Sequence, residues 1–420
     1  MSPAPFQAPI GTHDVAPPES GRWQSLVARF AQAAGRAGYG LLQSPLFEEV
    51  GVFQRLGEET DVVGKEMYVF EDRGGRRLAL RPEGTAPVAR AFVQRRPPLP
   101  WKVWYATPSF RYERPQAGRY RQHHQVGIEA LGSADPDLDV EVVTLAWDLL
   151  ADLGLGQVAL LVNSMGDQTC RPAYLAGLAR FLGPRREGLC DDHRERVAAN
   201  PLRALDCKRD ACREATVDAP RLVDALCRAC AEHFERVRAG LGELGVAARL
   251  DARLVRGLDY YTRTTFELQA PALAAAQSTV AAGGRYDGLV EALGGPPTPG
   301  VGFGLGIERT LLACDAEGAF PPPPSPVEVW VVDIAGGQVA SQLTTALRRA
   351  GIGADRAFDG RSMRSQMKLA DRSGARLALI VGEEEVAKET VTVRALRGAG
   401  EQDTVTRDQV VAAVRRRLAR

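Results

Sequence analysis

The segment FRYERPQAGRYRQHHQVGIE, residues 110–129, carries four arginines, two glutamates and two adjacent histidines within twenty positions. Its residues alternate on both sides of RPQAG, which is typical of two antiparallel strands whose side chains point alternately to opposite faces. We expect one face of this pair to be polar, with Arg111 and Glu113, and the other to belong to the core, with Tyr112 and Ile128. This pair would form the floor of a binding site.

Gly127 lies on the polar face between Gln125 and Glu129. A residue without a side chain leaves a notch there, and a small polar ligand would fit in it. The nearby arginines are rigid bidentate donors that suit phosphate groups. The segment therefore indicates a nucleotide beside a small cationic or amphoteric ligand, and the alternative is a solvated hairpin with salt bridges.

Two later segments favour the nucleotide site. In GVGFGLGIER, residues 300–309, four alternating glycines leave one strand face bare, so a flat aromatic ring could lie on it beneath Arg309. The segment lacks the Gly-Lys-Ser/Thr of a Walker loop and the βαβ unit of a Rossmann fold. In LVRGLDYYTRTTFEL, residues 254–268, an arginine and two tyrosines precede a strand as a plausible ligand clamp, although the tyrosines could also be core residues.

Length and composition limit the domain count, the kind of binding site and the location that we expect. The 420 residues, 45% of them hydrophobic, suffice for two or three domains with cores of their own. The net charge of +1 means that any polyanion site must be local. The N-terminus shows no secretory signal, and no run approaches the ~20 apolar residues of a membrane helix. We therefore expect a cytoplasmic location and no membrane partner.

The order of the segments predicts an α+β fold. Residues 1–319 would form an antiparallel-sheet domain with a helical insertion at about 168–242, since that stretch has little strand pattern. The proline-rich segment 320–326 reads as a stiff linker. Residues 327–420 read as a compact α/β module.

Together these segments resemble the signature motifs of the histidyl-tRNA synthetases, which are class II aminoacyl-tRNA synthetases. FRYERPQAGRYRQHHQ is similar to motif 2, GVGFGLGIER to motif 3, and LVRGLDYY and GGRYDGLV to the two histidine-specific elements. LRPEGTAPVAR resembles the substrate-binding turn of the family, and EETDVVGKEMYVFED another characteristic run. The resemblance spans nearly the whole first domain and implies that it is a class II catalytic domain.

The resemblance implies a ligase that activates L-histidine with ATP and Mg2+ and transfers it to the 3′ end of tRNA(His). It assigns catalysis at the α-phosphate to Arg111 and Arg256. It assigns histidine binding to Glu83, Gly84, Thr85, Arg111, Gln125, Glu129, Arg256, Tyr260 and Tyr261. It assigns ATP binding to Arg111, Glu113, Arg119, His123 and Arg309, with His123 at a position where the family commonly has Phe. Arg114 and Gln116 are our candidates for contacts to the tRNA acceptor end.

The C-terminal module resembles the anticodon-binding domain of this family. Basic residues gather in it at Arg356, Arg361, Arg364, Lys368 and Arg372, and a solvated basic face is the alternative. The resemblance also implies a homodimer whose interface includes residues 41–50. The alternative function is that of the synthetase-like regulatory subunit of ATP phosphoribosyltransferase, which keeps this fold, senses histidine and lacks an anticodon domain. A tRNA-binding or stress-sensing relative is a third option.

Five of the seven cysteines lie in one tenth of the chain, and a reducing compartment argues against disulfides. Cys207, Cys212, Cys227 and Cys230 could hold a structural Zn2+, with Cys190, His193 and His233 as spare ligands. Alternatively, Cys227 and Cys230, which lie three apart in an expected helix, pack there as small hydrophobic residues.

Overall fold

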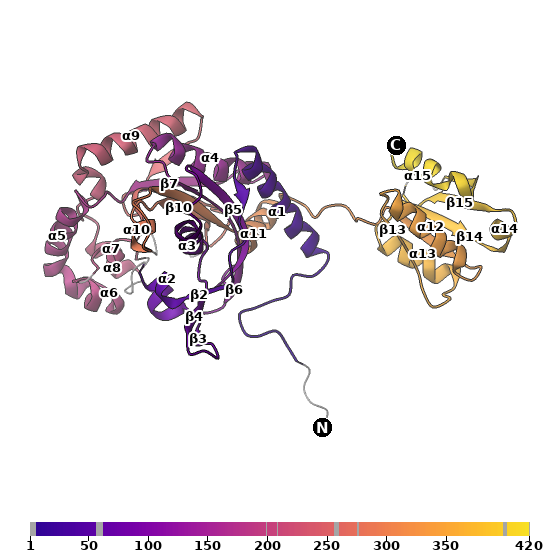
Figure 1. The fold of residues 1–420 in the computed structure, drawn as a ribbon, viewed down its shortest axis with the longest axis horizontal. Helices are drawn as coiled ribbons and strands as arrows, with labels where there is room; N and C mark the ends of the chain where they lie inside the picture. Colours follow the sequence, from indigo (N-terminus) through magenta and orange to yellow (C-terminus); the bar gives the residue numbers. More distant parts are fainter. Residues whose placement is uncertain are drawn as a thin grey trace, which may run out of the picture. The chain divides into compact units, whose positions relative to one another are not determined.

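The computed structural model describes residues 6–55, 62–198, 200–207, 209–255, 260–274, 277–397 and 401–419. They belong to two compact units, Met1–Pro322 and Pro323–Arg420, so the division falls inside the proline-rich segment. Figure 1 shows the first unit in indigo to orange and the second in orange to yellow. In the described part of the chain, no helix has the length and apolar character needed to cross a membrane.

The first unit is built on an eight-stranded sheet with the order β1-β5-β6-β11-β10-β9-β7-β8. The strands are β1 (Gly40–Leu41), β5 (Trp101–Phe110), β6 (Gln122–Leu131), β7 (Ala159–Ser164), β8 (Ala248–Leu250), β9 (Thr262–Gln269), β10 (Thr279–Arg285) and β11 (Gly300–Gly306). The six strands from β5 to β7 in this order pair antiparallel, and the short outer strands β1 and β8 pair parallel with their neighbours. The expected antiparallel α+β core is confirmed.

Four helices pack against one face of this sheet: α1 (Glu19–Arg36), α4 (Pro136–Asp152), α9 (Arg228–Glu243) and α11 (Ile307–Glu317). Val126 and Ile128 of β6 and Phe303 of β11 are buried beneath them, as their alternation predicts. The Asp135 carboxylate accepts the Asp137 N–H at 2.9 Å and caps α4. The opposite face of the sheet is left for the site.

A second, three-stranded sheet with the order β2-β4-β3 lies in the same unit. Its strands are β2 (Phe47–Glu49), β3 (Val69–Glu71) and β4 (Arg77–Leu80), and the accompanying helices are α2 (Val50–Gln54), the π-helical turn Val62–Glu66, α3 (Thr85–Arg95) and α10 (Leu289–Ala292). The hairpin between β3 and β4 turns at Asp72, whose carboxylate accepts the N–H groups of Gly74 and Arg76. Residues 41–50, which the resemblance places at a dimer interface, include the end of β1 and all of β2, two short strands in different sheets on either side of Pro45.

The insertion is helical, as expected. It contains α5 (Arg171–Leu182), a 3-10 turn (Gly183–Gly188), α6 (Asp191–Arg196), α7 (Leu202–Leu205), α8 (Asp210–Ala215), a 3-10 turn (Leu222–Ala225) and α9. It has a small core of its own that includes Leu178, Leu182, Leu205 and Cys212. Most of its helices are too short to be stable alone.

The second unit is an α/β module on a five-stranded sheet with the order β13-β12-β14-β15-β16. Its strands are β12 (Val329–Asp333), β13 (Ala354–Arg356), β14 (Leu377–Val381), β15 (Thr390–Ala395) and β16 (Gln402–Thr406). Its helices are α12 (Gln338–Arg349), α13 (Met363–Arg372), α14 (Glu383–Ala387), a 3-10 turn (Arg407–Gln409) and α15 (Val410–Leu418). The strands β12, β13 and β14 are parallel, whereas β15 and β16 pair antiparallel.

One detail of the opening segment differs from its prediction. The ladder between β5 and β6 ends at the pair Phe110 and Gln122, so Arg111 and Glu113 lie on the connecting loop. Tyr112 is therefore not a core residue: it is 56% exposed, and the guanidinium carbon of Arg121 lies 3.9 Å from its ring centre. Beyond the last strand pair, alternation no longer fixes which way a side chain points.

Candidate active site

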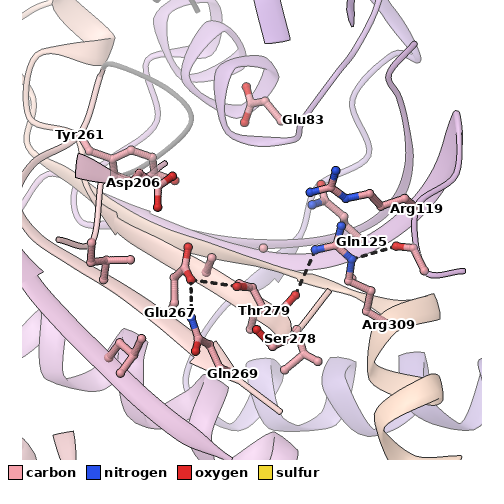
Figure 2. A pocket seen from close by; sticks show the side chains of 18 of the residues that line it. Glu83, Arg119, Gln125, Asp206, Tyr261, Glu267, Gln269, Ser278, Thr279 and Arg309 are labelled. Atoms are coloured by element: carbon pink, nitrogen blue, oxygen red, sulfur yellow. Dashed lines mark hydrogen bonds between the residues drawn. The ribbon is translucent and has the colours of Figure 1, made fainter. Parts of the chain in front are cut away.

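The open face of the eight-stranded sheet holds a cavity of ≈ 920 Å3. Figure 2 shows side chains from several elements pointing into it. The cavity brings together most of the predicted site residues, namely Glu83, Gly84, Thr85, Arg111, Glu113, Arg119, His123, Gln125, Tyr260, Tyr261 and Arg309. Its size lies within the range of small-molecule sites. Arg256 falls outside the described residues, so its assignment stays a prediction.

Glu83 places a negative charge at the N-terminal end of α3. Its two carboxylate oxygens accept the backbone N–H groups of Thr85 at 2.6 Å and Ala86 at 2.8 Å, and the Tyr260 hydroxyl lies 3.5 Å away. Burial raises the pKa of Glu83, while these hydrogen bonds and the charge of Arg111 act in the opposite direction. A buried carboxylate that lines a cavity is stabilised by a cationic ligand.

The notch expected at Gly127 is filled by a side chain, and Glu129 does not line the cavity. A Cβ built on Gly127 would lie 2.4 Å from the Tyr105 hydroxyl oxygen, so the Tyr105 ring fills the space above the glycine. Glu129 is fully buried and accepts hydrogen bonds from Thr85 at 2.7 Å, from Tyr105 at 3.2 Å and from Tyr286. Burial raises the pKa of Glu129 to about 8. Tyr105, and not Glu129, therefore presents a polar group to the cavity.

The glycine face of β11 is bare only at one end. A Cβ on Gly300 would lie 2.3 Å from the Tyr286 ring, and one on Gly302 would lie 1.9 Å from a Glu129 oxygen. Gly304 and Gly306, by contrast, line the cavity. The space for a flat ring is therefore the half of the strand next to Arg309, and protein side chains fill the other half.

Arg309 connects the loop after β5 to β10. Its Nε donates to the Gly118 carbonyl at 2.8 Å and its Nη1 to the Thr279 carbonyl at 3.2 Å (Figure 2). Burial lowers the pKa of Arg309, and the charges of Arg119 and Arg111 lower it further. Three guanidinium groups that repel one another at one cavity would be stabilised by a polyanion such as a triphosphate.

His123 also lines the cavity. Burial lowers its pKa to about 3, and the nearby charges of Arg111 and Arg309 contribute to this shift. The ring is therefore neutral near pH 7 and offers a flat face rather than a charge. Arg111 itself is held by a hydrogen bond from its Nε to the Pro82 carbonyl at 2.9 Å.

Arg114 and Gln116 do not line the main cavity. They line a second hollow of ≈ 500 Å3 on the loop, and Glu113 and Arg119 line both hollows. An ion pair of 3.6 Å joins Glu113 to Arg119. The two assignments to the tRNA acceptor end therefore fall beside the main cavity.

Sequence reasoning missed several residues of the cavity wall. On the sheet, Glu267 accepts hydrogen bonds from Thr279 at 2.8 Å and from Gln269 at 3.1 Å (Figure 2). The position of Glu267 between the apolar residues Phe266 and Leu268, both buried, could have indicated that it lies on the opposite, polar face of the strand. From the insertion and the loop after β8 come Leu205, Asp206, Cys207, Arg213, Glu214, Asp251 and Arg253. No local pattern indicates that the insertion closes the cavity.

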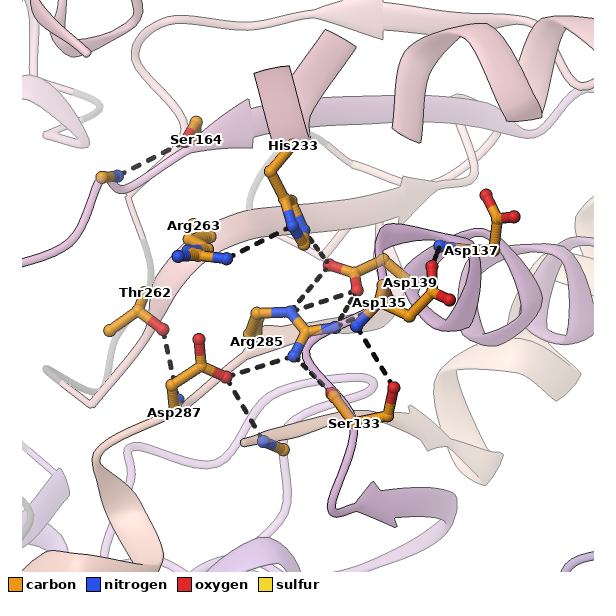
Figure 3. A network of polar contacts seen from close by, with 12 residues as sticks. Ser133, Asp135, Asp137, Asp139, Ser164, His233, Thr262, Arg263, Arg285 and Asp287 are labelled. Atoms are coloured by element: carbon orange, nitrogen blue, oxygen red, sulfur yellow. Dashed lines mark hydrogen bonds and ion pairs between the residues drawn. The ribbon is translucent and has the colours of Figure 1, made fainter. Parts of the chain in front are cut away.

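The predicted zinc set is wrong as a single site. Cys207 and Cys212 precede and begin α8, whereas Cys227 and Cys230 lie at the start of α9, and each pair joins a different cluster of side chains. His233 is not a spare ligand of either cluster, because its Nε2 lies 3.2 Å from a carboxylate oxygen of Asp139. Figure 3 shows this histidine within a network of polar contacts.

Comparison with known proteins identifies the family. The family model of histidyl-tRNA synthetase matches residues 11–167 and 186–310, and that of an anticodon binding domain matches residues 328–417. The chain belongs to the histidyl-tRNA synthetase family. A histidine–tRNA ligase of Moorella thermoacetica is 49% identical over 409 residues, which cover 96% of each chain.

Solved structures of the histidyl-tRNA synthetase family agree with this fold. The apo histidyl-tRNA synthetase of S. aureus matches with a TM-score of 0.82 and 34% identity, covering 97% of this chain and 99% of that chain. A Bacillus halodurans protein described as an ATP phosphoribosyltransferase regulatory subunit/histidyl-tRNA synthetase has a TM-score of 0.62 and 20% identity, covering 84% of this chain and 93% of that chain. The second likeness concerns the fold alone.

Proposed function

We propose that this chain is a histidine–tRNA ligase, which activates L-histidine with ATP to histidyl-adenylate and transfers it to the 3′ end of tRNA(His). One observation carries the proposal: the buried Glu83 carboxylate and the guanidinium groups of Arg111 and Arg309 line one cavity. These charges suit an amino acid with a free ammonium group beside a nucleoside triphosphate.

On the amino-acid side, Glu83 would hold the α-ammonium group together with Thr85 and Gln125, which line the same cavity. Tyr105 donates its proton to Glu129, so its oxygen is free to accept an imidazole N–H. In this arrangement Glu129 is a positioning residue behind Tyr105. An amino acid that leaves such buried polar groups unpaired would be rejected by about 10⁴ or more.

On the nucleotide side, Arg309 and His123 would flank the adenine, and Arg119 would lie toward the phosphates. As the histidine carboxylate attacks the α-phosphorus, Arg111 would stabilise the charge that develops there, and pyrophosphate leaves. Arg256 would share this role. The carboxylates of Glu113 and Glu267 line the cavity and are the hard oxygen ligands that Mg2+ prefers, so Mg2+ entering with ATP fits the site.

The second unit would bind the anticodon of the tRNA. Arg361, Arg364, Lys368 and Arg372 are exposed on α13 and the loop before it, and the Arg356 guanidinium carbon lies 4.6 Å from the ring centre of the exposed Phe358. Cations beside an exposed aromatic ring suit single-stranded nucleic acid. This unit also favours the ligase over the regulatory subunit, which lacks an anticodon domain.

A homodimer and a cytoplasmic location complete the proposal. Exposed apolar side chains lie on the short strands β1, β2 and β3, including Leu41, Phe47 and Phe70. The rings of Phe47 and Phe70 lie 6.2 Å apart, centre to centre. An exposed apolar group of this kind suits a subunit interface.

Histidine-dependent exchange of pyrophosphate into ATP tests the first step, and charging of tRNA(His) tests the second. We expect both activities, with L-histidine as the preferred amino acid. Absence of exchange would refute the ligase, and exchange without charging would refute the role of the second unit. Gln116→Ala should lower charging and spare exchange; an equal loss of both would contradict the placement of Gln116 at the acceptor end.

A further inference from the structure

The helical insertion and the residues that lead into it contain two clusters of metal-ligand side chains, and the four cysteines expected to form one zinc site are divided between them. One consists of Cys190, His193, Cys207 and Cys212, and the other of Asp167, Cys170, Cys227 and Cys230. Within each cluster the ligand atoms all lie within 4.8 Å of one another. We propose that each cluster binds one structural zinc ion.

The ligand atoms of the first cluster lie near the distances that tetrahedral zinc requires. Cys190 Sγ lies 3.0 Å from His193 Nδ1 and 3.9 Å from Cys207 Sγ, and Cys212 Sγ lies 3.8 Å from His193 Nδ1. Bonds of about 2.3 Å to sulfur and 2.0 Å to nitrogen at tetrahedral angles put such ligand atoms about 3.5–3.8 Å apart. Three thiols and one imidazole form a common donor set of structural zinc sites.

The backbone around the first cluster supports ligation. The Cys190 N–H donates to Cys212 Sγ at 3.3 Å, a contact that stabilises a thiolate. The ligands come in two short pairs, Cys190 with His193 around the start of α6 and Cys207 with Cys212 around the start of α8. Helices of six residues cannot hold this geometry by themselves, and small cores of this kind are often completed by a metal.

The second cluster is independent of the first and lies where the insertion begins and ends. Asp167 and Cys170 follow β7 and precede α5, and Cys227 and Cys230 begin α9, which leads back to the sheet. Asp167 Oδ1 lies 3.7 Å from Cys170 Sγ and 3.8 Å from Cys227 Sγ. An ion there would fasten the two ends of the insertion together.

The Asp167 carboxylate also has the supporting contacts of a metal ligand. It accepts the Thr169 N–H at 2.9 Å, and Arg263 Nη2 lies 3.8 Å from its second oxygen. Such outer contacts fix the orientation of a ligating carboxylate. The same oxygen that faces the thiols is therefore held in place from the backbone.

The first zinc ion would also shape the active-site cavity. Cys207 and its neighbour Asp206 line that cavity, and Arg213 and Glu214 of α8 follow Cys212 into the same wall. The ion would therefore hold in place the part of the cavity wall that the insertion supplies, and it would take no part in the chemistry. The proposal does not depend on the ligase activity, because it concerns metal content.

Metal analysis of the full chain, purified without added zinc or chelator, tests both sites. We expect about two zinc ions per chain, falling to about one in Cys212→Ser and to about one in Cys230→Ser. Cys314→Ser is the matched control, because Cys314 is buried in α11 and belongs to neither cluster, and it should keep two. An unchanged zinc content in Cys212→Ser overturns the first site, and in Cys230→Ser the second.

Two further measurements do not depend on whether a serine variant folds. His193→Cys should retain both ions because it restores four ligands, whereas His193→Ala should lose one. Thiol modification of the unaltered chain should release about two zinc ions to a colorimetric chelator. Release of no zinc would overturn both sites, whatever the pyrophosphate exchange activity of the same preparation.

Discussion

Arg285 and Asp139 form an ion pair in which both side chains are completely buried. The two carboxylate oxygens of Asp139 accept hydrogen bonds from Arg285 Nε at 3.2 and 3.1 Å. One of these oxygens also lies 3.2 Å from His233 Nε2 (Figure 3). Arg285 belongs to the GGRYDGLV segment, which the family resemblance connects with histidine recognition. The neighbouring Tyr286 donates to Glu129, so the pair anchors the strand end that holds the floor of the site.

Arg285→Met should lower the free energy of unfolding by about 3–5 kcal/mol, because it leaves the buried Asp139 charge without its arginine and with only His233 beside it. Urea denaturation followed by circular dichroism measures the change. The double variant Asp139→Leu/Arg285→Met should recover much of the loss, since neither charge is then left alone. As a control, Arg228→Met removes the pair with Glu232, whose side chains are 91% and 64% exposed, and should cost below about 1 kcal/mol. Equal losses in both arginine variants would contradict the buried-pair argument.

Gly84→Ala should damage histidine use more than ATP use. A Cβ on Gly84 would lie 2.5 Å from Cζ of Tyr105, whose hydroxyl is held by Glu129. Displacing Tyr105 should lower kcat/KM for histidine by about 10- to 100-fold, since small misplacements in an active site are costly. Steady-state pyrophosphate exchange with each substrate varied in turn measures this.

Gly177→Ala is the matched control, because a Cβ on Gly177 meets no atom within 4 Å in the middle of α5. It should keep full activity and gain up to about 1 kcal/mol of stability from the better helix propensity of alanine. Unchanged histidine kinetics in Gly84→Ala would show that Tyr105 does not contact the amino acid.

The sequence predicts the sheet more completely than the site. Alternation places Val126 and Ile128 in the core, and it does so because the period of a strand is a local property. Gly127 reads as a notch, but the ring that fills it comes from Tyr105, which the strand register pairs directly opposite. Register is a long-range property, so the sequence shows the gap and not the side chain that occupies it.

The same limit explains why the sequence suggested one zinc site for cysteines that belong to two clusters. Cys207 and Cys212 look like partners of Cys227 and Cys230 because these pairs are close in sequence. In the structure the intervening residues, with the 3-10 turn Leu222–Ala225, lead the second pair to the base of the insertion. Only the three-dimensional path of the chain reveals that Asp167 and Cys170 lie there.

Glu129 should make stability fall as pH rises. Burial raises its pKa to about 8 in the folded protein, above the ordinary value of 4.5. Its contribution is therefore fully present below pH 4.5 and is lost as pH rises through 8, with a slope of at most about 1.4 kcal/mol per pH unit. Urea denaturation at a series of pH values should show a flatter profile for Glu129→Gln than for the unaltered chain. Glu232→Gln, at an exposed position, should keep the original slope; identical slopes in all three proteins would contradict a buried, protonated Glu129.

His123 should act as a flat, neutral ring beside ATP. Burial and the charges of Arg111 and Arg309 lower its pKa to about 3, so it carries no charge between pH 6 and 8. His123→Phe should then change the KM for ATP by less than about threefold, whereas His123→Ala should raise it by about 5- to 150-fold, because stacking on a base contributes about 1–3 kcal/mol. Pyrophosphate exchange at pH 6 and pH 8 measures both effects. The KM for ATP of the unaltered protein divided by that of His123→Phe should be the same at both pH values. A ratio that changes between pH 6 and pH 8 would show that the His123 ring titrates in the site.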